Sequence, residues 1–179
     1  SNVSHWNENI ESLKQQIAKA EEEIELDMRE VDSLTFELSE GEDPTERIQN
    51  LRDFKVKFNS KIKDLTKEIK FFKGNASCPT CHQDIKFDLR DNMVSTDEDK
   101  VSKLNEALDK IAKEHKLLDK DLTERNEIST LIKESQIKIK QSLSDINWKT
   151  KKIKEIEKEI ESIKTDDGSV DKEKDKLLK

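Results

Sequence analysis

Residues 101–122, VSKLNEALDKIAKEHKLLDKDL, carry apolar side chains at alternating intervals of three and four residues. The members of this series are Val101, Leu104, Leu108, Ile111, Leu118 and Leu122, with His115 at one of its positions. Such spacing places the whole series on one face of an α-helix, and it is the heptad pattern of a coiled coil. The stretch therefore predicts a long helix whose narrow apolar seam packs against another helix.

The same seam continues toward the C-terminus after a polar position at Arg125. Its further members are Ile128, Ile132, Ile139, Leu143, Ile146, Ile153, Ile156, Ile160 and Ile163. Upstream, Ser95-Thr96-Asp97-Glu98 has the form of a capping box, which predicts that the helix begins there. We therefore expect residues 96–166 to form one arm of a coiled coil, followed by a charged tail at residues 167–179.

A second arm is predicted at residues 1–73, with a break near residues 41–44. Its seam members are Ile10, Leu13, Ile17, Ala20, Ile24, Met28, Val31, Leu34 and Leu38, then Ile48, Leu51, Phe54, Phe58, Ile62, Leu65, Ile69 and Phe72. Gly41 is typical of a helix end, and Asp43-Pro44-Thr45-Glu46 of a new start, with Asp43 as the N-cap and Pro44 at the first helical position. Gly74-Asn75 stops the arm.

The apolar stretches 10–72 and 101–163 have the same length, and a short non-helical insert separates them. Equal arms on either side of a turn predict an antiparallel pairing, in which residues 41–44 lie opposite residues 129–132. The alternative is that each arm pairs in parallel with its counterpart in another chain. The predicted fold class is all-α: an antiparallel coiled-coil hairpin with a Cys-x-x-Cys zinc hook at its apex.

Composition limits the functions that this chain can have. Only 31% of residues are hydrophobic, 42% are charged and the net charge is −7. A chain this polar cannot bury a thick core, so we do not expect an enzyme. An acidic surface also argues against a grip on nucleic acid. The sequence contains no apolar run of membrane-spanning length and no signal peptide, which predicts a cytoplasmic protein without membrane contact.

The insert, residues 74–95, contains the only two cysteines of the chain, in the motif Cys78-Pro79-Thr80-Cys81. Apolar residues alternate with charged ones at Ile85, Phe87 and Leu89, which predicts a short strand. With Phe71 and Phe72, these side chains are expected to form a small apolar plug beneath the cysteine turn. Trp6 and Trp148 are expected to be packing residues near the open end of the arms.

Zinc binds thiolates in a tetrahedron, and a two-residue spacer lets one tight turn present two sulfurs to one ion. Pro79 stiffens the turn, and the N–H groups of Thr80 and His82 are expected to hydrogen-bond the sulfurs. No histidine completes the site: His82 adjoins Cys81 too closely, and His5 and His115 lie far along the arms. We therefore predict Cys78 and Cys81 as metal ligands of one Zn²⁺ ion shared between two chains, that is, a homodimer joined through the hook.

Four other interpretations of the cysteines remain open. Cys78-Pro79-Thr80-Cys81-His82 matches the attachment motif of c-type haem, and Cys-x-x-Cys also occurs in thioredoxin-like dithiols. The cysteines can instead form disulfides that make the chain a redox-sensing tether. Finally, they can be incidental in a purely structural coiled-coil spacer.

The chain resembles the zinc-hook segment of the large ATPase subunit of double-strand-break repair nuclease complexes, a relative of the chromosome-maintenance ATPases. Cys78-Pro79-x-Cys81, the apolar Ile85 four positions later and the flanking arms carry the resemblance. It implies two coils joined by one zinc ion, with DNA and a nuclease subunit engaged by head domains that are missing from this sequence.

The sequence lacks the phosphate loop G-x-x-x-x-G-K-[ST] of such ATPases, so we expect a hook-and-coil piece rather than the enzyme itself. Its short arms, rich in lysine, isoleucine and aspartate, resemble a bacteriophage or bacterial version. For a bacteriophage protein the expected location is the host cytoplasm.

Overall fold

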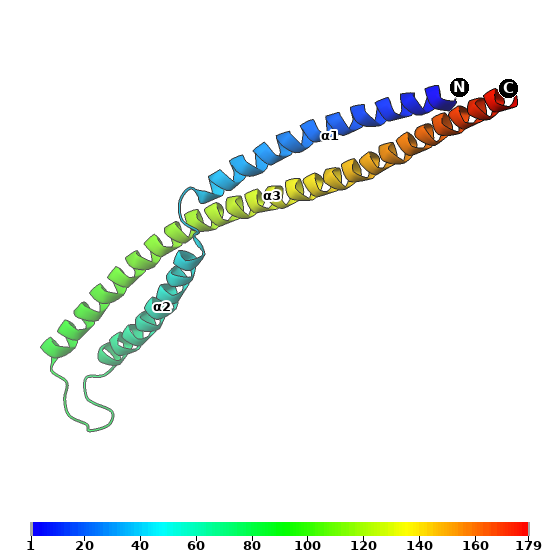
Figure 1. Ribbon diagram of the computed structural model, residues 1–179. Helices are drawn as coiled ribbons and strands as arrows, with labels where there is room; N and C mark the ends of the chain where they lie inside the picture. The colour runs from blue at the N-terminus through cyan, green and yellow to red at the C-terminus, as the bar shows by residue number, and fades with distance from the viewer. Residues whose placement is uncertain (1, 179) are drawn as a thin grey trace. The chain divides into compact units, whose positions relative to one another are not determined.

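The computed structural model describes residues 2–178, with the side chains of residues 169–172 and 175 outside the description. Within that part of the chain there are three α-helices and no β-strand: α1 (Asn2–Ser39), α2 (Thr45–Gly74) and α3 (Phe87–Leu177), shown in Figure 1. The prediction of an all-helical protein is confirmed. None of the described helices combines the length and the apolar character needed to cross a membrane.

Contacts between helices divide the chain into two units, which are described separately. The α1 unit contains the chain up to Glu40 and the part of α3 from Glu127 onward. In it, α1 lies beside the C-terminal part of α3, as Figure 1 shows. The buried core of this unit consists of Ile10, Leu13, Ile153, Ile156 and Ile160, against which Val3, Trp6 and Ile17 pack. Residues near the start of α1 thus meet residues near the end of α3, so the two helices are antiparallel.

The α2 unit contains residues 41–126, where α2 packs against the N-terminal part of α3. Leu51 is its most deeply buried side chain, at 2% exposure. Across the two helices, Arg47 Nε lies 2.8 Å from Glu114 Oε1, and Lys73 Nζ lies 2.8 Å from Glu98 Oε1. Because higher numbers on α2 meet lower numbers on α3, this pair is also antiparallel.

The predicted register is wrong in the α2 unit. A Cβ atom added to Gly41 would lie 3.0 Å from Arg125 Nη2, whereas the prediction places residue 41 opposite residues 129–132. Arg47 and Glu114, which lie on the hairpin side of the connection between α1 and α2, already pair out of the predicted register. The shift therefore arises at the hairpin end, where α3 begins at Phe87 instead of at residues 95–96.

The connection itself has the predicted stop and restart. Gly41 has a φ of 76°, the left-handed conformation that glycine adopts without steric cost. Asp43 Oδ1 accepts hydrogen bonds from Thr45 N–H at 2.9 Å and from Thr45 Oγ1–H at 2.6 Å. These two bonds lower the pKa of Asp43, because they favour its charged form. Helix α2 begins at Thr45 with Pro44 as its N-cap, so the prediction of Asp43 as the N-cap and Pro44 as the first helical residue is wrong by one residue.

The predicted start of the returning arm is wrong. Helix α3 begins at Phe87, ahead of the predicted start at residues 95–96, and Arg90 N–H donates to Lys86 O at 3.0 Å in its first turn. The strand expected around Ile85 and Leu89 does not form. Ile85 lies in the connection before α3, and Phe87 and Leu89 lie in the first turn of α3, where residues two apart do not share a face.

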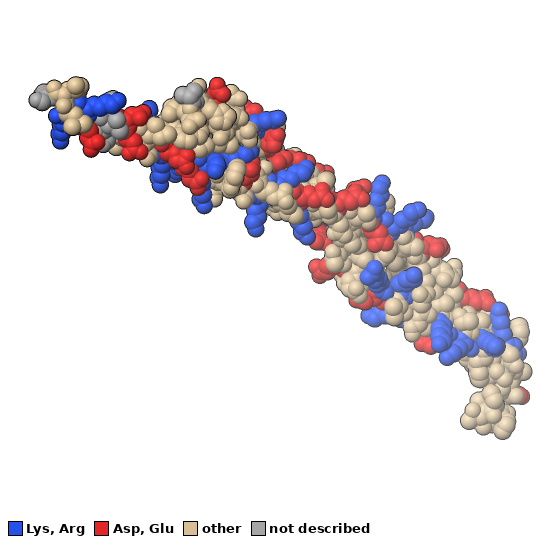
Figure 2. All heavy atoms as spheres, turned by 90° about the vertical axis from the view of Figure 1, so that its right-hand side faces the viewer, with Lys and Arg blue, Asp and Glu red and all other residues tan. Residues whose placement is uncertain are grey.

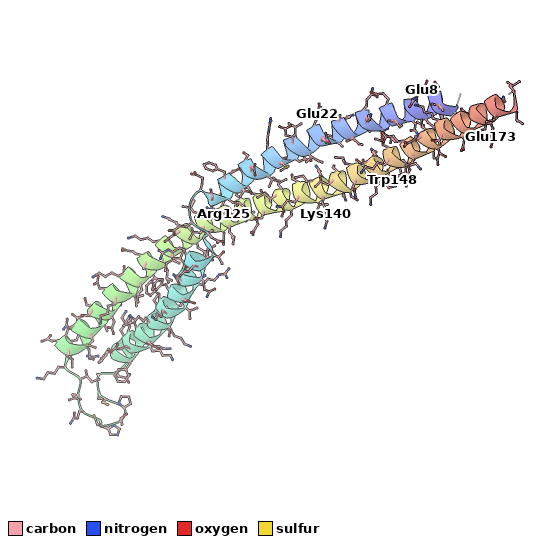
Figure 3. The ribbon with its side chains drawn as sticks, viewed as in Figure 1. Glu8, Glu22, Arg125, Lys140, Trp148 and Glu173 are labelled. Carbon is pink, nitrogen blue, oxygen red and sulfur yellow. The ribbon has the colours of Figure 1, made fainter. Side chains whose placement is uncertain are left out.

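The expected apolar plug is only partly present. Phe71 and Phe72 meet edge to face with ring centroids 5.2 Å apart, but Phe87 is 69% exposed and Leu89 is 53% exposed. Because Phe87 and Leu89 lie on the first turn of a helix, they do not point together under the cysteine turn. Trp148 (Figure 3) is also 60% exposed, so its expected packing role is wrong, whereas Trp6 does pack against the core.

At the other end, α3 continues through residues 166–169, where the apolar seam stops, and ends at Leu177. The loss of apolar residues ends the packing pattern without ending the helix, because Lys, Glu and Asp side chains are tolerated on a solvated helix.

Candidate metal centre

The two cysteines lie in residues 75–86, the connection between α2 and α3, which we name the cysteine hairpin. Asn75 Nδ2–H donates to Phe71 O at 2.9 Å and closes the end of α2. Ser77 and Asp84 then form an antiparallel β-bridge. Two backbone bonds flank it, from Ile85 N–H to Ala76 O at 2.9 Å and from Cys78 N–H to Gln83 O at 2.8 Å. The backbone thus folds into a narrow ladder that carries residues 78–81 at its tip.

The tip is closed by His82, which has a φ of 60° and donates its N–H to Cys78 O at 2.8 Å. Histidine is one of the residue types that adopt this left-handed conformation more often than most. The expectation that this N–H bonds a sulfur is wrong, because it is used to close the turn. Both cysteines are therefore held by one short backbone loop.

The two sulfurs lie close together and both thiols are free. Cys78 is half-buried and Cys81 is exposed. The N–H groups of Cys81 and Thr80 hydrogen-bond the Cys78 sulfur, and these bonds lower the pKa of that thiol. The side chains of Cys81 and Thr80 also hydrogen-bond it and act in the same direction. The turn therefore favours a thiolate at Cys78.

This donor set fits zinc, which binds thiolates and is commonly found on Cys-x-x-Cys turns. Hydrogen bonds from backbone N–H groups to the sulfurs are typical of the groups that surround metal ligands. Among the residues that the structure describes, no three or more His, Cys, Asp or Glu side chains gather in an arrangement able to hold a metal. His115 lies on α3 with its Nδ1 3.0 Å from Asp119 Oδ2. The one chain thus presents two sulfur donors.

The surface around the turn differs from that of the helices. On the face that Figure 2 draws, acidic and basic side chains are interleaved along the helices, and uncharged atoms predominate at the end where the cysteine hairpin lies. Asp84 and Lys86 are the only charged residues in 75–86. A second molecule that approaches this end meets little electrostatic repulsion.

Sequence reasoning missed a second polar cluster near the hairpin. Asp97 is only 2% exposed, and the carboxyl of Glu68 on α2 hydrogen-bonds it. The sequence pattern assigns Asp97 to a capping box, where a carboxylate would face solvent. Its position four residues before Val101, in step with the seam, is the signal that places it against α2.

A scan of protein-family models finds none that matches this chain, and searches among curated proteins and among solved structures find no match either.

Proposed function

We propose that this chain is a zinc-dependent dimerisation hook on an antiparallel coiled-coil hairpin. Two copies meet at their cysteine hairpins and share one Zn²⁺ ion. The observation that carries the proposal is the pair of free, adjacent sulfurs of Cys78 and Cys81 at the tip of a narrow backbone ladder.

The chemistry of the turn supports a shared site. A structural zinc ion takes four ligands, and one copy brings two thiolates, so a second copy completes the tetrahedron. Cys78 deprotonates more readily than an ordinary thiol, because N–H groups of Thr80 and Cys81 stabilise its charge. When bound, zinc supplies the bond between the two copies, and the scarcity of charge around the turn allows the approach.

The wider role that we propose rests on the resemblance carried by Cys78-Pro79-x-Cys81 and Ile85. In it, the linked rods tether two ATPase and nuclease complexes during repair of DNA double-strand breaks and recombination. The nuclease subunit and the DNA are engaged by head domains outside this sequence. The chain itself performs no catalysis, and its location is the cytoplasm, or the host cytoplasm for a bacteriophage protein.

The test measures zinc content per chain together with molecular mass in solution. A shared site predicts half an ion per chain and a dimer, which becomes a monomer on chelation or in Cys78→Ser. Thr80→Val, which keeps both sulfurs and the backbone N–H groups, is the matched control and stays dimeric. An unchanged dimer after zinc removal, or one full ion bound to a monomer, contradicts the proposal.

One alternative has an observation in its favour. Because the sulfurs of Cys78 and Cys81 lie side by side, oxidation can join them, which would make the chain a structural spacer with redox-active cysteines. This alternative predicts little zinc, thiols that become titratable only after reduction, and an oligomeric state that chelator does not change. The same zinc and mass measurements, repeated with chelator and joined to a thiol titration before and after reductant, separate the two functions.

A further inference from the structure

Two acidic side chains face each other across the seam between α2 and α3. Glu68 comes from α2, Asp97 comes from α3, and their carboxyl groups hydrogen-bond. Asp97 is 2% exposed, and its Oδ2 is buried without a hydrogen-bond partner. Asp97 occupies a seam position, four residues before Val101. An acidic group therefore stands where the seam elsewhere carries apolar residues.

A hydrogen bond between two carboxyl groups requires a proton. An ionised carboxylate only accepts hydrogen bonds, so a pair without a proton has no donor between its members. Two such charges in contact repel each other, and the repulsion is stronger where water is excluded. The contact between Glu68 and Asp97 is thus one that exists only in the protonated pair.

We propose that Glu68 and Asp97 form a proton-operated latch: one shared proton holds α2 against α3 beside the cysteine hairpin, and its loss loosens this contact. The inference concerns the helix pair and does not depend on zinc. It goes beyond the proposed function, since it adds a pH response to the part of the arms that supports the hairpin.

The charged groups around the pair do not cancel its repulsion. Lys100 on α3 is the cation that acts on Glu68, and it opposes the effect of Asp97 without outweighing it. Lys73 on α2 is engaged with Glu98 of α3 at 2.8 Å. The groove one turn further along is lined by Asp64 and Lys61 from α2 and by Lys100 and Lys103 from α3, together with Leu65 and Leu104. On the hairpin side, Arg90 has a buried Nε without a hydrogen-bond partner.

A metal ion fits this position less well than a proton. Mg²⁺ keeps several of its waters when it binds carboxylates. Asp97 is almost completely buried, which leaves little room for a hydrated ion at its carboxylate. The described residues bring two carboxylates to this position, and no cluster of three acidic, histidine or cysteine side chains forms there.

The sign of the pH response is set by the pKa of Glu68. The hydrogen bond to Asp97, partial burial and the charge of Asp97 raise this pKa above its ordinary value of 4.5. A raised pKa means that the contact contributes its full stability below the ordinary value. The contribution is lost as pH increases from 4.5 through the raised value. Each unit of pKa shift changes the equilibrium between closed and open contact about tenfold.

The decisive experiment compares Glu68→Gln with wild type in the full chain, kept zinc-free and reduced, from about pH 2 to 8, a range that spans the titrations of Glu68 and of the control Glu114. A glutamine amide donates a hydrogen bond to Asp97 without needing a proton. We expect the wild type to lose thermal stability relative to Glu68→Gln as pH increases through the titration of Glu68. Carbon NMR of the side-chain carboxyls measures that titration directly, and its midpoint should lie above 4.5.

Glu114→Gln is the matched control in the same unit. Arg47 hydrogen-bonds Glu114 and lowers the pKa of its carboxyl, so its contribution appears as pH increases and is lost as pH falls through the lowered value. The two glutamates should therefore show opposite signs. If Glu68→Gln folds poorly, Asp97→Asn tests the same proton from the other side of the pair.

Three results would overturn the latch. One is an unchanged pH dependence in both Glu68→Gln and Asp97→Asn. Another is a Glu68 carboxyl that titrates at or below its ordinary pKa. The third is stabilisation of wild type, but not of Glu68→Gln, by millimolar Mg²⁺ at about pH 8, which would identify a cation in place of the proton.

Discussion

At the scale of single residues, Cys78 stands out because its surroundings lower the pKa of its thiol. Its sulfur receives N–H groups from Cys81 and Thr80, whereas the neighbouring N–H of His82 goes to a carbonyl oxygen. The backbone of the turn therefore divides its donors between holding the loop closed and stabilising a thiolate. Zinc binding releases protons from thiols, so a thiol that ionises easily lowers the pH at which the metal binds.

This division predicts the reactivity of Cys78. In zinc-free Cys81→Ser, Cys78 is the sole thiol. The rate at which iodoacetamide alkylates it should rise with pH, and the midpoint of that rise should lie below the ordinary thiol pKa of 9.0. The backbone bonds that lower the pKa remain in this variant. The same variant in concentrated urea is the control, and its midpoint should return to the ordinary value. Equal midpoints in the folded and unfolded states would show that the turn does not activate the sulfur.

Gly41 is the second residue with a specific conformational duty. Its φ of 76° is costly for any side chain, and a Cβ there would lie 3.0 Å from Arg125 Nη2 (Arg125 is labelled in Figure 3). We expect Gly41→Ala to destabilise the protein by about 1–2 kcal/mol. Gly168→Ala, in α3 with open space around it, should instead stabilise the helix by up to about 1 kcal/mol. Thermal unfolding of both variants measures the contrast, and equal effects would contradict it.

At the scale of elements, the apolar seam made the long helices predictable. Polar residues in the seam near the start of α3 concealed where that helix begins. Spacing of three and four residues located most of α1, α2 and α3, because apolar side chains repeat along them. The first turns of α3 were missed because the seam there passes through Arg90 and Asp97, which no hydrophobic pattern detects.

For the candidate site, the sequence predicted that Cys78 and Cys81 share one short turn, and the structure brings them together there; their role as metal ligands stays a prediction. The sequence could not place the His82 N–H, because which acceptor a turn amide reaches depends on backbone dihedral angles that composition does not fix. The Glu68 and Asp97 contact was hidden for a related reason: it requires knowing which residues of two helices stand opposite each other.

Burial within the α2 unit predicts a contrast between two leucines on facing helices. Leu51 is 2% exposed in α2, and Leu117 is 71% exposed in α3. Leu51→Ala should lower the free energy of unfolding by about 2–4 kcal/mol, since it leaves a cavity in the seam. Leu117→Ala should change it by about 0.5 kcal/mol or less. Urea unfolding monitored by circular dichroism measures both, and similar losses would mean that this seam does not hold the helices together.

At the scale of the whole molecule, the described helices have cores and ion pairs of their own that involve no metal ligand. The core of Ile10, Leu13, Ile153, Ile156 and Ile160, and the pair of Arg47 and Glu114, belong to the arms alone. Under the proposed function, metal binding and helix formation are therefore separable. This differs from small zinc domains, in which metal binding and folding are one event.

We accordingly predict that replacing both cysteines by serine removes the dimer and keeps the helices. Far-ultraviolet circular dichroism of Cys78→Ser/Cys81→Ser should match wild type, while sedimentation should give a monomer. A large loss of ellipticity in the double variant would mean that the metal supports folding of the arms.

The unequal cover of the two sulfurs has a kinetic consequence. Cys78 is partly enclosed and Cys81 is open to solvent, so in a dimer of the proposed kind a competing thiol or chelator would reach the shared ion from the Cys81 side first. Metal exchange should then proceed through an intermediate in which one sulfur from a protomer has let go and the other still holds. Under the proposed function, the link between two copies then breaks in two steps, and its lifetime depends on how long the enclosed Cys78 holds the ion after the exposed Cys81 has released it.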